Sequence, residues 1–302
     1  MAITKKVPPA SRKIVPAQPI KPLVKSPSVP PANTPSPAAT TTALTVSARS
    51  LLEQDAGAGM EGMTREDLAI PRLGILQALS PQCNKADSES YIDGAEPGMI
   101  HESVSNELFD GDPGILVVLV SYRRAHNEWI TRQEGGGFIA DHGPDPKILS
   151  ETTKDKMNRS LLPNGHEIVP TAEYFSFLIN EETGEITRAL ISMTKTQMRK
   201  AKKINTLASS LIVNTAKGPM QAPLFYRTFR LGTVPESNER GSWFGWAVKI
   251  DINTFDIMPP LGEQIYLQAR QFKKDVTAGS VKVDTPKTEH STTDHEGDDA
   301  PM

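Results

Sequence analysis

Residues 173–179 read Glu-Tyr-Phe-Ser-Phe-Leu-Ile, and residues 186–192 read Ile-Thr-Arg-Ala-Leu-Ile-Ser. Both segments are rich in aromatic and β-branched residues, which are enriched in β-strands. The connecting segment, Asn-Glu-Glu-Thr-Gly-Glu, contains Gly184, which can adopt the positive φ that a short hairpin loop needs. The two segments are therefore predicted to form an antiparallel β-hairpin.

Other elements are predicted on either side of this hairpin. The apolar run Ile-Leu-Val-Val-Leu-Val-Ser-Tyr at 115–122 is typical of a buried strand. Two more strands are expected at 223–231 and 243–252, joined by a connection over 232–241. A helix is predicted over 194–214 with Thr194 as its N-cap, a last helix over 261–274, and a polar loop with a short helix around 150–158. The fold class expected is α+β, mainly antiparallel β: an OB-like barrel or related sheet with one central and one C-terminal helix.

The two ends of the chain carry opposite charge. Residues 1–52 hold seven Lys/Arg and no Asp or Glu, whereas residues 284–302 hold six acidic residues against one lysine, a net charge of −5. Residues 1–52 also contain ten prolines and few large apolar residues. Such a segment cannot bury enough apolar surface to offset the entropy that it would lose on folding. We therefore expect a disordered basic Pro-rich arm over 1–50, a single folded domain over 64–275, and a disordered acidic tail over 276–302.

The composition indicates the cellular compartment in which the protein acts. Cys83 is the single cysteine, so no intrachain disulfide can form, which is typical of a reducing environment. The chain contains no run of 18 apolar residues and no secretory signal pattern at its start. A cytoplasmic protein that does not cross a membrane is expected.

Catalytic motifs are not found in the sequence. It contains no P-loop, no Gly-x-Ser-x-Gly and no Cys-x-x-Cys, and it predicts no cofactor and no metal. His142, next to Asp141 and Asp145, is the best metal candidate, but a polar loop explains it more simply. A nuclease would need a carboxylate cluster, and Asp110, Asp112 and Asp141 would be the first residues to test. The protein is predicted not to be an enzyme.

Basic residues are interleaved with aromatic ones in three segments, at 122–132, 225–230 and 243–249. Proteins that bind single-stranded nucleic acid stack bases on aromatic rings, at about 1–3 kcal/mol per base, and follow the backbone with Lys and Arg. Because side chains alternate along a strand, one face could be core and the other a stacking platform. Aromatic residues in strands are most often core, and the sequence does not tell which face is which.

The predicted helix over 194–214 adds a basic face opposite its apolar face. A solvated amphipathic helix would show the same pattern, and phosphate contact is the functional alternative. Bases are expected to stack on some of Trp129, Tyr226, Trp243 and Trp246. Phosphates are expected to meet Arg123, Arg124, Arg132, Lys195, Arg199, Lys202, Lys203, Arg227 and Arg230.

Three segments resemble a family of mostly uncharacterised tailed-phage proteins: Leu-Ala-Ile-Pro-Arg-Leu-Gly-Ile-Leu-Gln-Ala-Leu-Ser-Pro-Gln at 68–82, Glu-Trp-Ile-Thr-Arg-Gln-Glu-Gly-Gly-Gly-Phe at 128–138, and Ile-Ser-Met-Thr-Lys-Thr-Gln-Met-Arg-Lys-Ala-Lys-Lys-Ile-Asn-Thr-Leu at 191–207. The resemblance covers about residues 64–272. The layout is also similar to phage and bacterial single-stranded DNA-binding proteins, which have an OB-like core and an acidic C-terminal tail that recruits replication proteins. Those tails often end in an aromatic or other hydrophobic residue, whereas this chain ends Ala-Pro-Met.

Together, the aromatic-basic segments, the lack of catalytic motifs and these resemblances predict a non-enzymatic single-stranded DNA-binding protein of phage DNA replication or recombination, acting in the host cell cytoplasm. Single-stranded DNA is the expected partner. Replication or recombination proteins would bind through the acidic tail, and an oligomer is possible. The alternatives are a virion structural or assembly protein, and an enzyme of phage DNA metabolism such as a nuclease.

Overall fold

The computed structural model describes residues 46–64, 67–86, 89–239, 241–257 and 260–281, except for the side chains of 46–49 and 132. Most of the predicted arm and most of the predicted acidic tail lie outside these residues. A helix that the sequence did not predict, α1 (Val46–Gln54), belongs to a unit of its own, Met1–Ala58. Every other element belongs to the second unit, Gly59–Met302.

The second unit contains thirteen strands and two α-helices among its described residues. The helices are α2 (Met198–Ser209) and α3 (Leu261–Thr277). The strands are β1 (Arg72–Ile75), β2 (Ile100–Glu102), β3 (Leu108–Phe109), β4 (Ile115–Ile130), β5 (Gly137–Asp141), β6 (Thr153–Lys154), β7 (Ser160–Leu161), β8 (Glu167–Ile179), β9 (Ile186–Thr194), β10 (Ile212–Thr215), β11 (Gly218–Gln221), β12 (Arg227–Asn238) and β13 (Gly241–Asn253).

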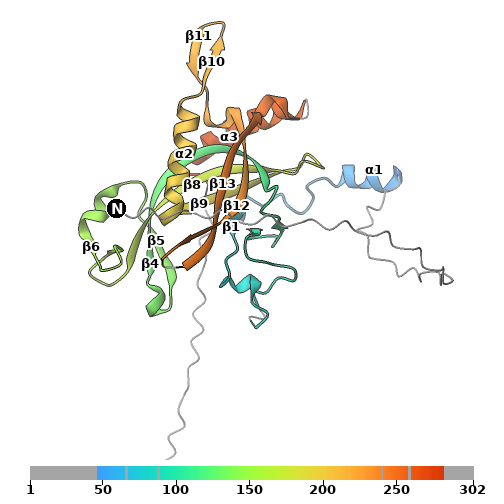
Figure 1. Ribbon diagram of the computed structural model, residues 1–302. Helices are drawn as coiled ribbons and strands as arrows, with labels where there is room; N and C mark the ends of the chain where they lie inside the picture. Colours follow the sequence, from blue (N-terminus) through green and yellow to red (C-terminus); the bar gives the residue numbers. More distant parts are fainter. Residues whose placement is uncertain (1–45, 65–66, 87–88, 240, 258–259, 282–302) are drawn as a thin grey trace, which may run out of the picture. The chain divides into compact units, whose positions relative to one another are not determined.

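Eleven of these strands form one sheet, whose main path runs β13-β12-β4-β8-β9-β1-β2-β3. Neighbouring strands are antiparallel except β1 and β9, which are parallel. The long strands curve into a half-barrel (Figure 1). The α+β class with a mainly antiparallel sheet is therefore confirmed, with α2 and α3 as the central and C-terminal helices. The remaining strands, β10 and β11, form a separate hairpin.

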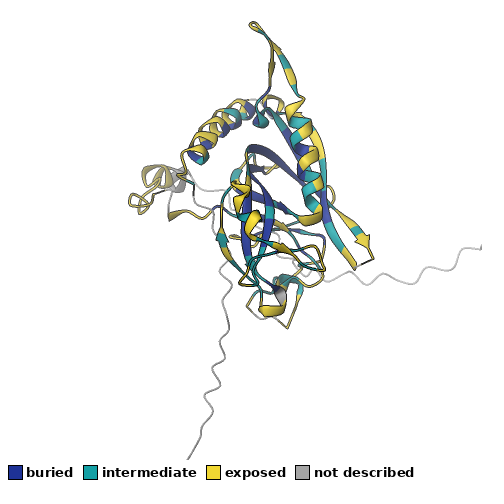
Figure 2. Cartoon of the chain, turned by 90° about the vertical axis from the view of Figure 1, so that its left-hand side faces the viewer, coloured by how far each residue is buried: buried dark blue, intermediate teal, exposed yellow. Residues whose placement is uncertain are grey.

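Both faces of the sheet are buried at its centre. Residues 115, 117 and 119 of β4 lie in one core cluster with Ala201 and Ile204 of α2. Residues 116, 118 and 120 lie in a second cluster with Phe272 of α3. Because side chains of a strand alternate, α2 and α3 cover opposite faces, here named the α2 face and the α3 face. Figure 2 shows the middle of the sheet as buried and the outer sides of the helices as exposed.

The predicted hairpin is confirmed. β8 and β9 pair from Ile179 with Ile186 onward, and Gly184 in the loop has φ 74°. The strand predicted at 115–122 is also confirmed, although β4 continues to Ile130. A β-bulge between Leu119 and Ser121 marks the point where the apolar run ends. Beyond it the strand is polar, which is why its pattern did not reveal it.

The central helix is shorter than predicted. Lys195 has φ 48°, which is not an α-helical conformation. Residues 195–197 form a 3-10 turn, and α2 begins at Met198. Thr194 occupies the N-cap position of this turn but makes no side-chain cap hydrogen bond, and the N-cap of α2 itself is Gln197. At the other end, β-branched Ile212 and Val213 enter β10 instead of extending the helix.

The last two strands extend further than predicted into the segment between them, whereas the predicted start at 223 is wrong, since Leu224–Tyr226 is a 3-10 helix and β12 begins at Arg227. The segment 232–241, expected to be a connection, is mostly paired strand of the β12–β13 hairpin, since Thr233 faces Trp246 and Glu236 faces Trp243. The short helix expected around 150–158 is also wrong, because this stretch contains the 3-10 helix Pro146–Glu151 and then β6.

Glutamine side chains cover part of the open edge of β13. The side-chain amide of Gln77 donates to the carbonyl oxygen of Phe244 at 2.9 Å and accepts from its N–H at 2.9 Å. The N–H of Trp246 donates to Gln197 Oε1 at 2.9 Å. These bonds satisfy backbone groups that an edge strand leaves unpaired. They also hold the segment just before α2 against β13, which positions the site described next.

Candidate nucleic-acid interface

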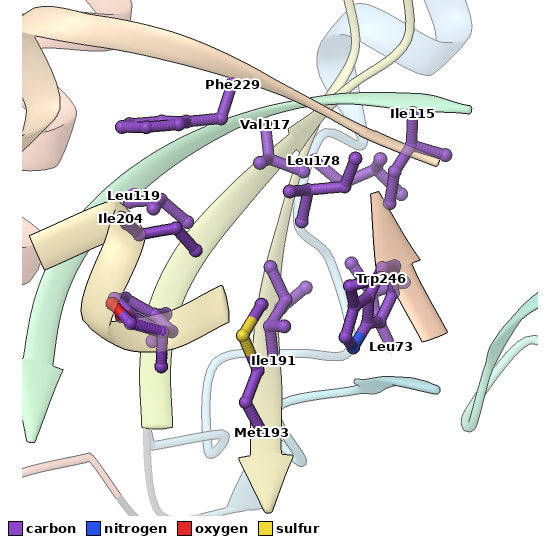
Figure 3. Close-up of a cluster of buried hydrophobic side chains, with 14 of the residues drawn as sticks. Leu73, Ile115, Val117, Leu119, Leu178, Ile191, Met193, Ile204, Phe229 and Trp246 are labelled. Atoms are coloured by element: carbon purple, nitrogen blue, oxygen red, sulfur yellow. The ribbon is translucent and has the colours of Figure 1, made fainter. Parts of the chain in front are cut away.

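Trp246 is part of the core. Its side chain is 3% exposed and lies beside Leu73 in the cluster on the α2 face (Figure 3). The alternation of β13 turns this ring inward together with Val248, which packs against the same cluster. A ring enclosed by the core cannot stack on a base, so the prediction for Trp246 is wrong.

Arg123 lies on the α3 face and is already paired. Its Nε donates to Glu173 Oε2 at 2.7 Å, and its Nη2 pairs with Asp141 Oδ2 at 2.7 Å. The guanidinium also stands over the ring of Phe175, 5.7 Å from its centroid. Two carboxylates neutralise this cation, so Arg123 is not a free phosphate ligand.

Arg230 is bound in the same way on the α3 face. Its guanidinium contacts Glu181 at 2.8 Å and Asp251 at 3.2 Å. The bond to Arg230 lowers the pKa of Glu181, and the bond to Glu181 is the main cause that raises the pKa of Arg230. Arg227 donates to the backbone oxygen of Asp251 at 3.4 Å. The pattern of arginines in this strand therefore reflects internal pairing.

Two of the aromatic residues pack against other rings. Tyr226 lies 6.1 Å from the ring of Phe255, and Trp129 meets Phe138 edge-on at 5.4 Å between centroids. Both are half-buried. Trp129 thus belongs to an aromatic pair and Tyr226 to a separate aromatic cluster, and the side chain of Arg132 lies outside the described residues.

The basic residues of the central helix are different. Arg199, Lys202 and Lys203 are all exposed on α2. No ion pair with any described residue involves these three side chains. Lys195, just before the helix, is also exposed and forms an ion pair with Glu167 at 3.0 Å. The basic face predicted from periodicity is therefore present.

A cleft of about 510 Å³, here named the tryptophan cleft, lies at one side of α2 and is lined by Arg199, Glu236 and Trp243 among others. Trp243 Nε1 donates to Glu236 Oε2 at 3.0 Å, and the same carboxylate pairs with Lys200 at 2.9 Å and accepts from Gln197 at 3.0 Å. The bond to Lys200, with those from Gln197 and Trp243, outweighs burial and lowers the pKa of Glu236. An ionised Glu236 thus holds the half-exposed indole beside the helix.

A second cleft, here named the basic cleft, lies at the start of α2 and has a volume of about 270 Å³. It contains three predicted residues, Arg124, Lys195 and Lys202. It also contains Lys154 and Arg159, which the sequence argument missed. Those two belong to the β6–β7 hairpin, which has no aromatic residue and for which the sequence predicts a polar loop with a short helix. Five cations thus surround one concavity.

His142, the best metal candidate in the sequence although no metal was predicted, is hydrogen-bonded to a carboxylate. His142 Nε2 lies 2.7 Å from Glu128, and His166 Nδ1 lies 2.6 Å from the same carboxylate. Burial raises the pKa of Glu128, but the hydrogen bonds from His166, His142 and Asn164 lower it more. Within the described ranges, no group of three or more His, Cys, Asp or Glu side chains is arranged to hold a metal ion.

A family model described as Pam3 phage gp34-like protein matches residues 39–282. The chain belongs to this family. The match spans every strand of the sheet and both clefts beside α2, and it confirms the resemblance to phage proteins. No curated protein and no solved structure matches the chain. In the described part of this gp34-like protein, none of the helices is long and apolar enough to span a membrane.

Proposed function

We propose that this phage protein binds single-stranded DNA during replication or recombination, and that it acts by binding alone. The observation that supports the proposal is the surface around α2. Arg199, Lys202 and Lys203 are exposed on α2; Arg199 lines the cleft that contains Trp243, and Lys202 is one of the five cations that line the other cleft. Lysine and arginine neutralise phosphates, and an aromatic ring stacks on bases of any sequence.

The position of these cations on the helix adds a second argument. α2 begins at Met198 and has no acidic residue in its first turn, which instead holds Arg199 and Lys200 near the positive end of the helix dipole. Each cation placed there costs about 0.3–1 kcal/mol relative to the other end of a helix. A bound polyanion would offset that cost, because its charge is attracted both to the side chains and to the helix terminus.

The half-barrel would then serve as the OB-like platform expected from the sequence, with α2 on one of its faces. The acidic tail predicted over 276–302, of which Val276 and Thr277 belong to α3, would recruit replication or recombination proteins in the cytoplasm of the infected cell. Of the residues predicted from sequence, the proposal keeps Arg124, Lys195, Arg199, Lys202, Lys203 and Trp243.

The test is a fluorescence titration with oligo-dT and with a duplex of equal length, at about 50 and 200 mM salt. Oligo-dT is expected to quench tryptophan fluorescence and to bind more weakly at high salt, whereas the duplex should bind poorly. Trp243→Phe should lose most of the quenching, and Trp129→Phe, which alters a ring packed against Phe138, should keep it. Quenching that survives in Trp243→Phe but not in Trp129→Phe would contradict the assignment.

One observation favours a virion structural or assembly role instead. The β10–β11 hairpin projects beyond α2 (Figure 1), with Ile212 57% and Met220 53% exposed. An isolated two-stranded hairpin is only marginally stable in water, so packing against another protein would stabilise it. This alternative predicts that the protein co-purifies with phage particles and has no salt-sensitive affinity for oligo-dT.

A further inference from the structure

The walls of the basic cleft come from segments that are far apart in the sequence. Arg124 belongs to β4, Lys154 to β6, and Lys202 to α2, while Lys195 lies in the turn before the helix. Arg159 lies in the turn between β6 and β7. The concavity therefore depends on the tertiary fold, which brings these cations together around about 270 Å³.

The cations exceed the carboxylates that could neutralise them. Lys195 pairs with Glu167 at 3.0 Å, and Arg159 pairs with Asp155 at 2.7 Å. Lys154 donates to the hydroxyl of buried Ser160 at 2.7 Å, a neutral partner. Five cations against two carboxylates leave a net charge of +3.

Arg124 and Lys202 contribute two of these uncompensated charges. Both are exposed, and neither forms an ion pair with a residue that the structure describes. Like charges gathered around one concavity repel each other, and an anion bound among them relieves that repulsion. Phosphate oxygens suit such a site, since each accepts short charge-assisted hydrogen bonds from arginine and lysine.

We infer that the basic cleft binds a phosphate monoester at the end of a nucleic-acid strand. An internal phosphodiester carries one negative charge and would leave +2, whereas a phosphate monoester carries about −1.5 to −2 and leaves close to +1. The cleft therefore matches the terminus better than the interior of a strand. This inference rests on the proposed function, in which the rest of the strand crosses α2 toward Trp243.

The experiment compares three oligo-dT strands by fluorescence anisotropy: one with a 5′-phosphate, one with a 3′-phosphate and one with hydroxyls at both ends. One of the two phosphorylated strands is expected to bind the full-length protein about tenfold more tightly than the unphosphorylated strand, the effect of one further charge-assisted bond. Arg124→Gln and Lys154→Gln should each reduce that preference. Lys217→Gln, which removes an exposed cation from the turn of the β10–β11 hairpin, is the control and should keep it.

Competition tests whether the phosphate group itself is what the basic cleft binds. Thymidine 5′-monophosphate and inorganic phosphate should both displace the phosphorylated strand at high concentration, because they present the same dianion. Equal affinity for the three strands would overturn the inference and leave the proposed function standing. The same holds if Lys217→Gln reduces the preference for a phosphorylated end as much as Arg124→Gln does. If none of the strands binds, the proposed function fails, and calorimetry with inorganic phosphate decides the cleft: binding lost in Arg124→Gln supports a phosphate site, and no binding overturns it.

Discussion

Two helices of this protein carry the same basic pattern. Arg199, Lys202 and Lys203 on α2, here the α2 triplet, have the same residue types and spacing as Arg270, Lys273 and Lys274 on α3, here the α3 triplet. All six side chains are exposed, and none of them pairs with a carboxylate in the described part of the chain. Charge and periodicity alone therefore do not distinguish the two surfaces.

The surroundings of the two triplets differ. The α2 triplet lies near the start of its helix, beside two clefts, whereas the α3 triplet lies near the end of its helix, where cations interact favourably with the dipole. Lys274, in the last turn of α3, thus has an explanation in stability, whereas Arg199, in the first turn of α2, does not. A basic helix face thus becomes a candidate site only when its position on the helix and its neighbours are known.

The largest expected effect is on the free energy of unfolding, and it comes from replacing a core residue of α3. Phe272 is fully buried, stacks on Phe177 at 5.4 Å between centroids and lies under the guanidinium of Arg188 at 4.8 Å. Phe272→Ala should lower the free energy of unfolding by about 3–5 kcal/mol, measured by urea denaturation. The affinity of the folded fraction for oligo-dT should not change. A selective loss of affinity with little loss of stability would show that the α3 face is the interface.

The next effect is on binding and compares the triplets directly. Replacing the α2 triplet by glutamine should weaken oligo-dT binding by about a hundredfold at low salt and reduce the salt slope by about 2, since each single-strand phosphate contact contributes about 0.7. The same replacement of the α3 triplet is the matched control, with identical residue types and spacing. Equal losses in both variants, measured over a salt series, would mean that only net charge matters.

The same two variants should have opposite effects on stability. Removing the α2 triplet takes the cation of Arg199 away from the positive end of the helix, so the free energy of unfolding should rise by about 0.3–1 kcal/mol at low salt. Removing the α3 triplet should lower it by a similar amount. Thermal unfolding of both variants at two salt concentrations measures this, because the dipole effect is screened. Changes of the same sign in the two variants would contradict the assignment.

Local pairing and periodicity could be predicted from the sequence. The β8–β9 hairpin, the strand from Ile115 and the start of α3 at Leu261 follow from short-range patterns. Alternation along β13 predicts that Trp243 and Trp246 lie on opposite faces of the strand. It does not predict which of the two rings the core encloses. That choice depends on which residues of other elements, such as Leu73, reach the same space.

The paired arginines could not be predicted because their partners are distant in sequence. Arg123 is neutralised by Glu173 of β8, and Arg230 by Glu181 of the β8–β9 loop. The same lack of non-local information hid Lys154 and Arg159, which join the basic cleft through a hairpin with no apolar alternation. An interleaved aromatic and basic pattern is therefore common to an internal ion pair and to a binding surface.

The smallest expected effect is the pH dependence of the tryptophan cleft. The pKa of Glu236 is lowered from its usual 4.5, mainly by Lys200, so its contribution to stability is present above pH 4.5 and is lost as the pH falls through the lower folded value. Glu236→Gln should cost about 1 kcal/mol or less at neutral pH, because the group is only partly buried, and the difference from wild type should shrink in acid. Glu239→Gln, an exposed carboxylate on the same hairpin, is the control. If urea unfolding gives Glu236→Gln the same deficit at pH 3 as at pH 7, the ionised carboxylate is not what holds Trp243 beside α2.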